Sequence, residues 1–221
     1  MRIVSMTNEG QIPMMKNMLN SAKKAGFPMS MFHCYVISTN KEVARYDTVQ
    51  FQAITLRKLE IILENLKQDS EIWWIDNDIV FFDTFSNILQ NMKTYPGQIV
   101  IQKDGWGFCT GYFLVRRTFA TLRVFQRSID WLRSNLNNRF LNDQHAFNAV
   151  YKSIIGLIVS ELPVDEYPNG MIYFDQNRKD KARILHNNYL FTTNDKIERF
   201  KNNNMWDESD EGFNLVNKYY I

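Results

Sequence analysis

The sequence predicts an α/β domain with a mainly parallel central sheet flanked by helices. Two features of the sequence predict it: the spacing of the apolar residues and the order of the segments. Short apolar segments of strand length alternate along the chain with longer segments whose apolar residues recur at helical spacing. This alternation is typical of parallel strands joined by crossover helices. The length of 221 residues suits one domain, which we expect to span residues 1–221 as a single catalytic unit.

The first part of the chain shows the alternation most clearly. In chain order, we expect strand, helix, strand, helix and strand at residues 2–6, 12–26, 29–38, 54–68 and 71–82. Pro13 and Gly26 mark the two ends of the first helix, because proline is favoured in a first helical turn and glycine just after a last one. Thr55 is a plausible N-cap for the second helix.

The second part of the chain is more mixed. We expect strands at residues 97–102, 111–117, 155–163, 171–174 and 182–188, and helices at 118–136 and 142–152. Asn142 or Asp143 caps the second of these helices. The polar tail at residues 194–221 is expected to be helical in parts.

Composition excludes several classes of protein. The formal net charge is only +2 and the basic residues are dispersed, which disfavours a nucleic-acid binder. Cys34 and Cys109 form no CxxC motif, so we expect neither a disulfide framework nor a zinc site. We therefore expect a protein of a reducing compartment. No signal-peptide pattern or membrane-spanning apolar run is present, and we therefore expect a cytoplasmic protein.

The segment "EIWWIDNDIVFF" (71–82) places two carboxylates inside an apolar strand. Asp76 and Asp78 alternate, so in a strand both would point to one face. Burying ionised carboxylates is costly without a partner. Paired oxygen donors suit a hard cation such as Mg²⁺ or Mn²⁺, and ligands of open α/β sheets bind beyond the carboxyl ends of strands. The alternative is that Asp76–Asn77–Asp78 forms a simple turn.

Four segments in order resemble the GT-A-fold, DxD-containing glycosyltransferases that use nucleotide sugars. "EIWWIDNDIVFF" resembles their DxD strand, and "GWGFCTGYFLVRRT" (105–118) their small-residue loop and following strand. "NDQHAFN" (142–148) resembles a helix start with an Asp-Gln pair. "LPVDEYPNGMIYF" (162–174) and "ARILHNNYLFTTNDK" (182–196) resemble the end of the catalytic domain, where a histidine and a later lysine close over the diphosphate. The compact form is similar to the glycosyltransferase domains of large DNA viruses that build capsid glycans.

The resemblance implies roles for individual residues. It implies a Mn²⁺ or Mg²⁺ site at Asp76, Asp78 and His186, and Asp143 as the catalytic carboxylate. It implies nucleotide and donor contacts at Thr7, Asn8, Arg57, Asp76, Asn77, Thr110, Gly111, Gln144 and Lys196. Each of these positions also has a purely structural interpretation. Thr7 would lie in an ordinary loop, Arg57 on a solvated helix face, and Asp143 would be a helix cap.

The function implied is metal-dependent transfer of a sugar from a UDP-sugar to a hydroxyl of a glycan or glycoprotein. Location in a host cytoplasm follows if the chain is viral. Inverting and retaining stereochemistry both stay open, with Asp143 the candidate base for inversion.

Two alternatives are a sugar-1-phosphate nucleotidyltransferase and a non-catalytic sugar-binding domain. The first would need a glycine-rich basic loop after the first strand, whereas "TNEGQIPMM" (7–15) has one glycine and no arginine. The intact acidic pair, His186 and Lys196 argue against the second.

Overall fold

A seven-stranded sheet forms the centre of the protein, whose computed structural model describes residues 1–38 and 48–221. The strands are β1 (Arg2–Asn8), β2 (Phe32–Ile37), β3 (Glu71–Ile75), β5 (Ile99–Lys103), β6 (Phe108–Arg116), β7 (Val159–Leu162) and β9 (Asn217–Tyr220). Their spatial order is β7-β5-β6-β3-β1-β2-β9. Strand β6 runs antiparallel to β3 and β5, and the other neighbouring pairs are parallel. The predicted mainly parallel α/β sheet is therefore confirmed.

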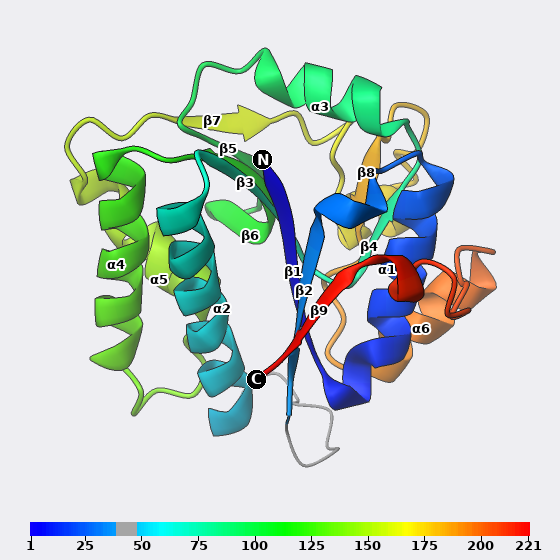
Figure 1. Ribbon diagram of the computed structural model, residues 1–221, viewed down its shortest axis with the longest axis horizontal. Helices are drawn as coiled ribbons and strands as arrows, with labels where there is room; N and C mark the ends of the chain where they lie inside the picture. The colour runs from blue at the N-terminus through cyan, green and yellow to red at the C-terminus, as the bar shows by residue number, and fades with distance from the viewer. Residues whose placement is uncertain (39–47) are drawn as a thin grey trace.

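Helices cover both faces of this sheet. They are α1 (Ile12–Lys24), α2 (Val49–Gln68), α3 (Phe85–Lys93), α4 (Phe119–Arg133), α5 (Asp143–Val150) and α6 (Thr193–Asn202). Helices α2, α4 and α5 lie together on one side, and α1 and α6 lie on the other (Figure 1). A small antiparallel sheet of β4 (Ile79–Phe81) and β8 (Ile184–His186) lies on the α1 side. Shorter helical turns span Glu9–Gln11, Met29–Met31, Tyr151–Ser153, Met171–Asp175 and Phe213–Leu215.

The apolar core is divided by the sheet into two layers. Successive residues of a strand point to opposite faces, so Ile3 packs with Trp73 toward α1 while Val4 packs with Trp74 toward α2 and α4. All four side chains are fully buried. The two consecutive tryptophans therefore fix β3 between both layers, one residue before the acidic triplet begins.

The predicted long strand at 71–82 is wrong in one respect, because the chain breaks it at the acidic triplet. Strand β3 ends at Ile75 in the main sheet, and β4 begins at Ile79 in the small sheet. Residues 76–78 form a bend between them. The turn reading of the triplet is therefore correct for the backbone, and the triplet also lies at the carboxyl end of a buried strand.

Three further predictions of local structure need correction. Helix α2 begins at Val49, because the Thr48 side chain accepts the cap hydrogen bond from the Phe51 backbone, and Thr55 lies inside the helix. Residues 171–174 belong to a helical turn, since the Asn169 side chain accepts from the backbone of Ile172 at 2.9 Å. Strand β9 extends the sheet from within the tail that was expected to be only partly helical.

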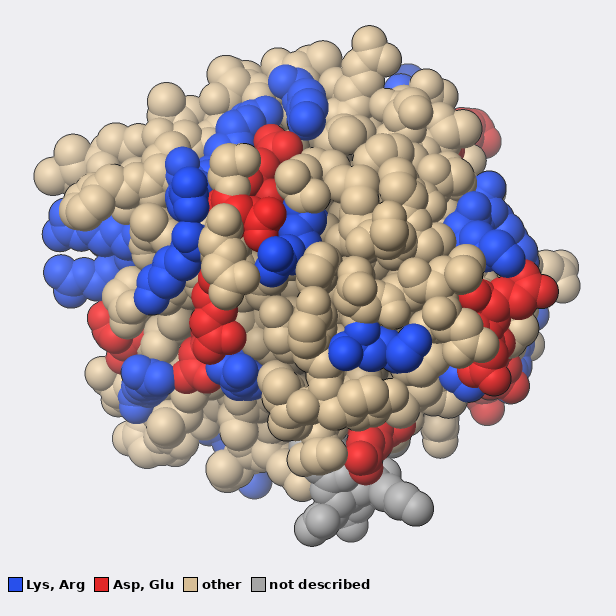
Figure 2. All heavy atoms as spheres, in the orientation of Figure 1, with Lys and Arg blue, Asp and Glu red and all other residues tan. Residues whose placement is uncertain are grey.

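Acidic and basic side chains are interspersed on the face shown in Figure 2, without a large area of one sign. This distribution agrees with the weak case for nucleic-acid binding. Among the helices of the described residues, none is both long and apolar enough to cross a lipid bilayer.

Both cysteines are free and buried, and we predict that Cys34 resists modification in the native protein. Burial raises the pKa of the Cys34 thiol to about 12, so the reactive thiolate is scarce at neutral pH. Labelling with a chromogenic disulfide reagent should leave Cys34 unmodified until urea unfolds the chain. Rapid labelling of Cys34 in the folded protein, located by peptide mass, would contradict this packing.

Candidate active site

A cavity of about 170 Å³ opens at the carboxyl ends of β1 and β3. Its walls come from those strand ends, from α2, from the start of α5, from the end of β8 and from α6. The lining residues are Met6, Thr7, Asn8, Gln11, Phe51, Ile54, Thr55, Lys58, Asp76, Asn77, Asp78, Asp143, His186 and Lys196. Eight of the residues to which the sequence assigned site roles, from five separate segments of the chain, thus meet in one place.

The acidic triplet and the end of β8 form a cluster suited to a cation. One ligand atom each from Asp76, Asp78 and His186 lies within 4.8 Å of the others. The backbone N–H of Asp76 donates to the carbonyl of Gly111 at 2.7 Å, which ties the bend to β6. Two carboxylates and an imidazole nitrogen are donors that Mn²⁺ accepts well, so this set fits the expected metal.

Asp78 is held by two cationic partners in this structure. Its Oδ2 lies 2.6 Å from Lys196 Nζ, and its Oδ1 lies 3.2 Å from His186 Nε2. Burial alone would raise the pKa of the Asp78 carboxyl, but Lys196 and His186 outweigh burial and hold this pKa far below its usual range. Burial would lower the pKa of His186, but Asp78 opposes it and the pKa is raised. Lys196 therefore supplies positive charge beside the position where a cation would bind.

Gly111 provides the space in which the His186 ring sits. A Cβ atom added at Gly111 would lie 2.1 Å from Cε1 of His186, which no real contact allows. The sequence-based role for Gly111 was close approach of the backbone to a ligand. The structure instead has the glycine backbone approach the imidazole that belongs to the acidic cluster.

A second charge network is centred on Lys58, which the sequence interpretation missed. Its Nζ lies 2.9 Å from Asp76 Oδ1 and 2.9 Å from Asp143 Oδ2. The Trp74 indole donates to Asp76 at 2.7 Å, and the Thr110 hydroxyl donates to Asp143 at 2.6 Å. Burial would lower the pKa of Lys58, but the two carboxylates outweigh it and raise the pKa. Lys58 is therefore a buried ammonium that holds both carboxylates in position.

Arg57, predicted to reach the diphosphate, does not line the cavity. Its guanidinium pairs with Glu60 at 3.2 Å and Glu64 at 2.9 Å on the outer side of α2. The signal was in the sequence: acids three and seven positions later lie on the same helix face as Arg57. Helical phase thus turns Lys58 inward and Arg57 outward.

The end of β1 presents polar groups to the cavity. Asn77 donates to the Thr7 hydroxyl at 3.1 Å and to the Gln11 side-chain oxygen at 3.2 Å. Within the described residues, the buried Oδ1 of Asn8 has no hydrogen-bond partner. A buried acceptor left unpaired is costly, so a donor group of a ligand would stabilise it.

Asn142, not Asp143, is the N-cap of α5, because its side chain accepts from the backbone of His145. Asp143 therefore keeps its carboxylate for the cavity, with both of its contacts on Oδ2. Gln144 does not line the cavity and donates to Asp104 at 2.9 Å. Thr110 and Gly111 also stay behind the lining and act on Asp143 and His186.

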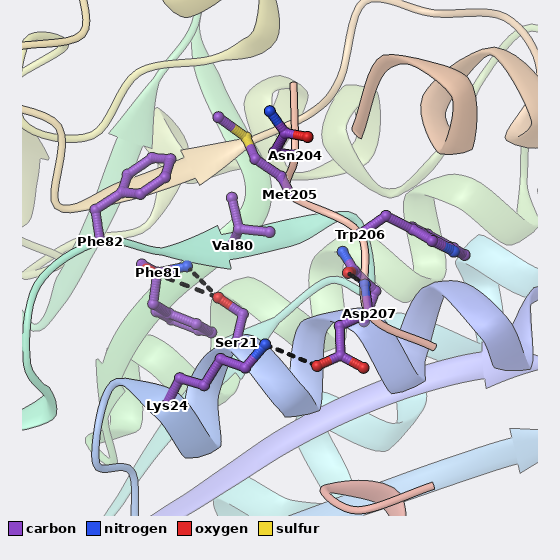
Figure 3. Close-up of a pocket in the computed structure, with 10 residues that line it drawn as sticks. Ser21, Lys24, Val80, Phe81, Phe82, Asn204, Met205, Trp206 and Asp207 are labelled. Atoms are coloured by element: carbon purple, nitrogen blue, oxygen red, sulfur yellow. Dashed lines mark hydrogen bonds and ion pairs between the residues drawn. The ribbon is translucent and has the colours of Figure 1, made fainter. Parts of the chain in front are cut away.

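A separate cavity of about 200 Å³ lies between α1, β4 and residues 204–207 (Figure 3). Val80, Phe82 and Met205 lie around it, and Lys24 pairs with Asp207 at 2.7 Å at its edge. Its one carboxylate is already paired and it holds no acidic cluster of the kind found at Asp76 and Asp78. This cavity is therefore not the candidate active site.

Comparison with known proteins identifies the family. The family model for nucleotide-diphospho-sugar transferases matches residues 14–200. The chain belongs to this family. A UDP-galactose:fucoside alpha-3-galactosyltransferase of Dictyostelium discoideum is 28% identical over 214 residues, which cover 82% of the chain. The chain spans about a third (32%) of the length of that relative.

Solved structures of glycosyltransferases share the fold. A glycosyltransferase involved in the glycosylation of the major capsid of PBCV-1 superposes with a TM-score of 0.62, 14% identity and coverage of 91% of this chain and 100% of that one. Galactosyltransferase LgtC, solved with donor and acceptor sugar analogues, gives a TM-score of 0.59 at 14% identity, covering 91% and 94%. GlyE of Streptococcus pneumoniae gives 0.58 at 14% identity, covering 96% and 62%. The GT-A resemblance of the sequence is confirmed.

Proposed function

We propose that this chain is a metal-dependent glycosyltransferase that moves a sugar from a UDP-sugar to a hydroxyl of a glycan or glycoprotein. One observation carries the proposal: Asp76, Asp78 and His186 meet in the cavity, with the ammonium groups of Lys58 and Lys196 beside them. Membership of the nucleotide-diphospho-sugar transferase family supports the donor class.

Asp76, Asp78 and His186 are the residues that would hold Mn²⁺ or Mg²⁺. Such an ion supplies Lewis-acid stabilisation of a departing nucleoside diphosphate. The chain's own residues complement this chemistry. Lys196 adds positive charge next to Asp78, where phosphate oxygens would lie, and it can exchange its carboxylate partner for phosphate because its side chain is about a quarter exposed (25%).

Other lining residues suit the two ends of a nucleotide sugar. Thr7, Asn8 and Asn77 present hydroxyl and amide groups at the end of β1, where we place the nucleoside. Asp143 is anchored through Oδ2. Its carboxylate lines the cavity and can accept the hydrogen of a sugar hydroxyl, whether to orient it or to take its proton. Sugar transfer passes through an oxocarbenium-like state, so leaving-group stabilisation contributes strongly.

A donor screen tests the proposal. Purified protein with Mn²⁺ is offered UDP-galactose, UDP-glucose and other nucleotide sugars, and release of nucleoside diphosphate is measured with and without fucosides. UDP-galactose comes first because the curated relative is named for that donor and a fucoside acceptor. Metal-stimulated release from at least one UDP-sugar is expected. Failure with every nucleotide sugar, in protein shown to be folded, would contradict it. A role in viral capsid glycan synthesis remains a separate prediction.

Lys196→Ala should weaken binding of UDP more than binding of uridine. The reason is that the ammonium meets phosphate charge, which uridine lacks. Loss of one charge-assisted contact corresponds to about 1.5–3 kcal/mol, or roughly ten- to a hundredfold in affinity. Calorimetric titration with the two ligands in the presence of Mn²⁺ measures the difference. Equal losses for UDP and uridine would remove Lys196 from the phosphate site.

Hydrogen exchange, measured without ligand and with UDP plus Mn²⁺, tests whether the segment that contains α6 closes over the donor. Slower exchange across residues 186–204 on addition of UDP and Mn²⁺ is expected if α6 orders over the diphosphate. Exchange that is indifferent to ligand would mean that α6 is permanently docked.

A further inference from the structure

We propose that Gln102 fixes the tautomer and ring orientation of His186, so that Nδ1 keeps its hydrogen and Nε2 is the nitrogen offered to a cation. Gln102 touches no ligand and acts through His186, so it is a positioning residue. This inference rests on the metal-binding part of the proposed function.

The orientation of the Gln102 carboxamide follows from its two contacts. Its Nε2 donates to the backbone carbonyl of Tyr167 at 3.0 Å, and a carbonyl can only accept. Its Oε1 therefore points the other way, where it lies 3.0 Å from Nδ1 of His186. That oxygen can also only accept, so Nδ1 must carry a hydrogen. Gln102 is fully buried, and water does not compete for either contact.

The opposite nitrogen of the ring then faces the acidic cluster. Nε2 of His186 lies 3.2 Å from Oδ1 of Asp78. Because Nδ1 donates its hydrogen to Gln102, Nε2 is the nitrogen that would offer its lone pair to a cation. A histidine ligand oriented by a hydrogen bond from its other nitrogen is a general feature of metal sites.

Cys109 is the only competing partner of Nδ1 that the described residues provide. Its Sγ lies 3.4 Å from Nδ1, and a thiol that donated there would place the hydrogen on the wrong nitrogen. The contact with Gln102 is shorter, and the amide oxygen is a stronger acceptor than sulfur. The Asn188 amide also donates to this sulfur at 3.8 Å. Gln102 therefore decides the tautomer against Cys109.

An interruption of the β5–β6 ladder explains how a glutamine of β5 reaches this position. Ile101 pairs with Phe113 but Gln102 pairs with Cys109, so the register skips residues 110–112 of β6. Irregular strand pairing of this kind redirects side chains and is common beside functional sites. Here it places Gln102 opposite the start of β6, next to the ring that Gly111 accommodates.

The test is Mn²⁺ affinity at saturating UDP, measured by the electron paramagnetic resonance signal of free Mn²⁺. Gln102→Leu removes the acceptor and should weaken Mn²⁺ binding by roughly 10–100-fold. Gln102→Glu keeps an acceptor oxygen for Nδ1–H and should retain affinity much closer to wild type. Gln52→Leu is the matched control, because Gln52 is equally buried and donates to the carbonyls of Asn135 and Asn138 without touching His186. It should leave Mn²⁺ affinity unchanged.

Nitrogen-15 spectra of the Mg²⁺–UDP complex provide a second readout that a purely structural role would not move. The sequence has only three histidines, so the signals can be assigned by substitution. Wild type and Gln102→Glu should show a hydrogen on Nδ1 of His186. In Gln102→Leu the hydrogen should no longer be confined to Nδ1.

The outcomes separate the two proposals. Wild-type protein that binds no Mn²⁺ with UDP overturns the metal site and this inference with it. Tight binding in wild type with equal affinity in Gln102→Leu, or an unprotonated Nδ1 in the wild-type complex, overturns this inference alone.

Discussion

Asp78→Asn should abolish metal-dependent release of UDP from a donor sugar while the protein stays folded. Asp78 contributes a carboxylate to the cluster that also contains Asp76 and His186, and an amide is a much weaker ligand for a divalent cation. Losing several kcal/mol of leaving-group stabilisation corresponds to a rate loss on the order of a thousandfold or more. Steady-state release of UDP, compared with thermal unfolding of the same samples, measures both parts.

Asp207→Asn is a matched control for this substitution. Asp207 forms an aspartate–lysine pair with Lys24 at 2.7 Å, much like the 2.6 Å pair between Asp78 and Lys196, but it lies at the separate cavity shown in Figure 3. Its loss should leave activity within a fewfold of wild type. Substantial activity of Asp78→Asn in excess EDTA would mean that this carboxylate does not serve a metal.

Lys58→Met should destabilise the fold strongly, and more at pH 8 than at pH 5. Lys58 is the shared partner of Asp76 and Asp143, so removing it leaves two neighbouring carboxylates without their ammonium. Breaking a buried ion pair by removing one partner costs about 3–5 kcal/mol. Urea denaturation at both pH values measures the free energy of unfolding.

The pH dependence follows from Asp76. Burial raises the pKa of Asp76 above its ordinary value of 3.8, and Lys58 opposes that rise. Without Lys58 this pKa rises further. Between the ordinary and the raised value, the folded protein binds more protons than the unfolded one, so stability falls as pH increases through that window. The destabilisation should therefore be partly relieved in acid.

Arg57→Met is the control one residue away. Arg57 forms partly exposed pairs with Glu60 and Glu64, and such surface pairs contribute about 0–1 kcal/mol. It should change stability little at either pH. Equal destabilisation by the Arg57 and Lys58 variants would show that the inward network is not a special feature of the site.

The sequence predicted the centre of the site because of its unusual context. Carboxylates between "WWI" and "IVFF" are conspicuous. The turn interpretation predicted the bend of the backbone, and the strand interpretation predicted the buried strand that precedes it. The backbone bends at residues 76–78, and the three side chains line the cavity at the carboxyl end of β3. His186 and Lys196 followed from the family resemblance, and both line the same cavity.

The features that were missed depend on contacts between distant segments. Glu60 and Glu64 already mark the outward face of Arg57 in the sequence, but the inward contacts of Lys58 with Asp76 and Asp143 depend on how α2 packs against the sheet. The position of Gln102 depends on an interruption of the ladder between β5 and β6. Strand β9 becomes a strand because β2 offers an open edge, with His33 opposite Asn217, and nothing local in its polar sequence shows that pairing.

The most direct test of the account is calorimetric titration of UDP into wild-type protein with Mn²⁺ and with EDTA. We predict measurable UDP binding in Mn²⁺ that is weakened at least tenfold in EDTA, and an Asp78→Asn variant that binds equally weakly in both. UDP affinity that is the same with Mn²⁺ and with EDTA would contradict the claim that Asp76, Asp78 and His186 join a metal to the diphosphate.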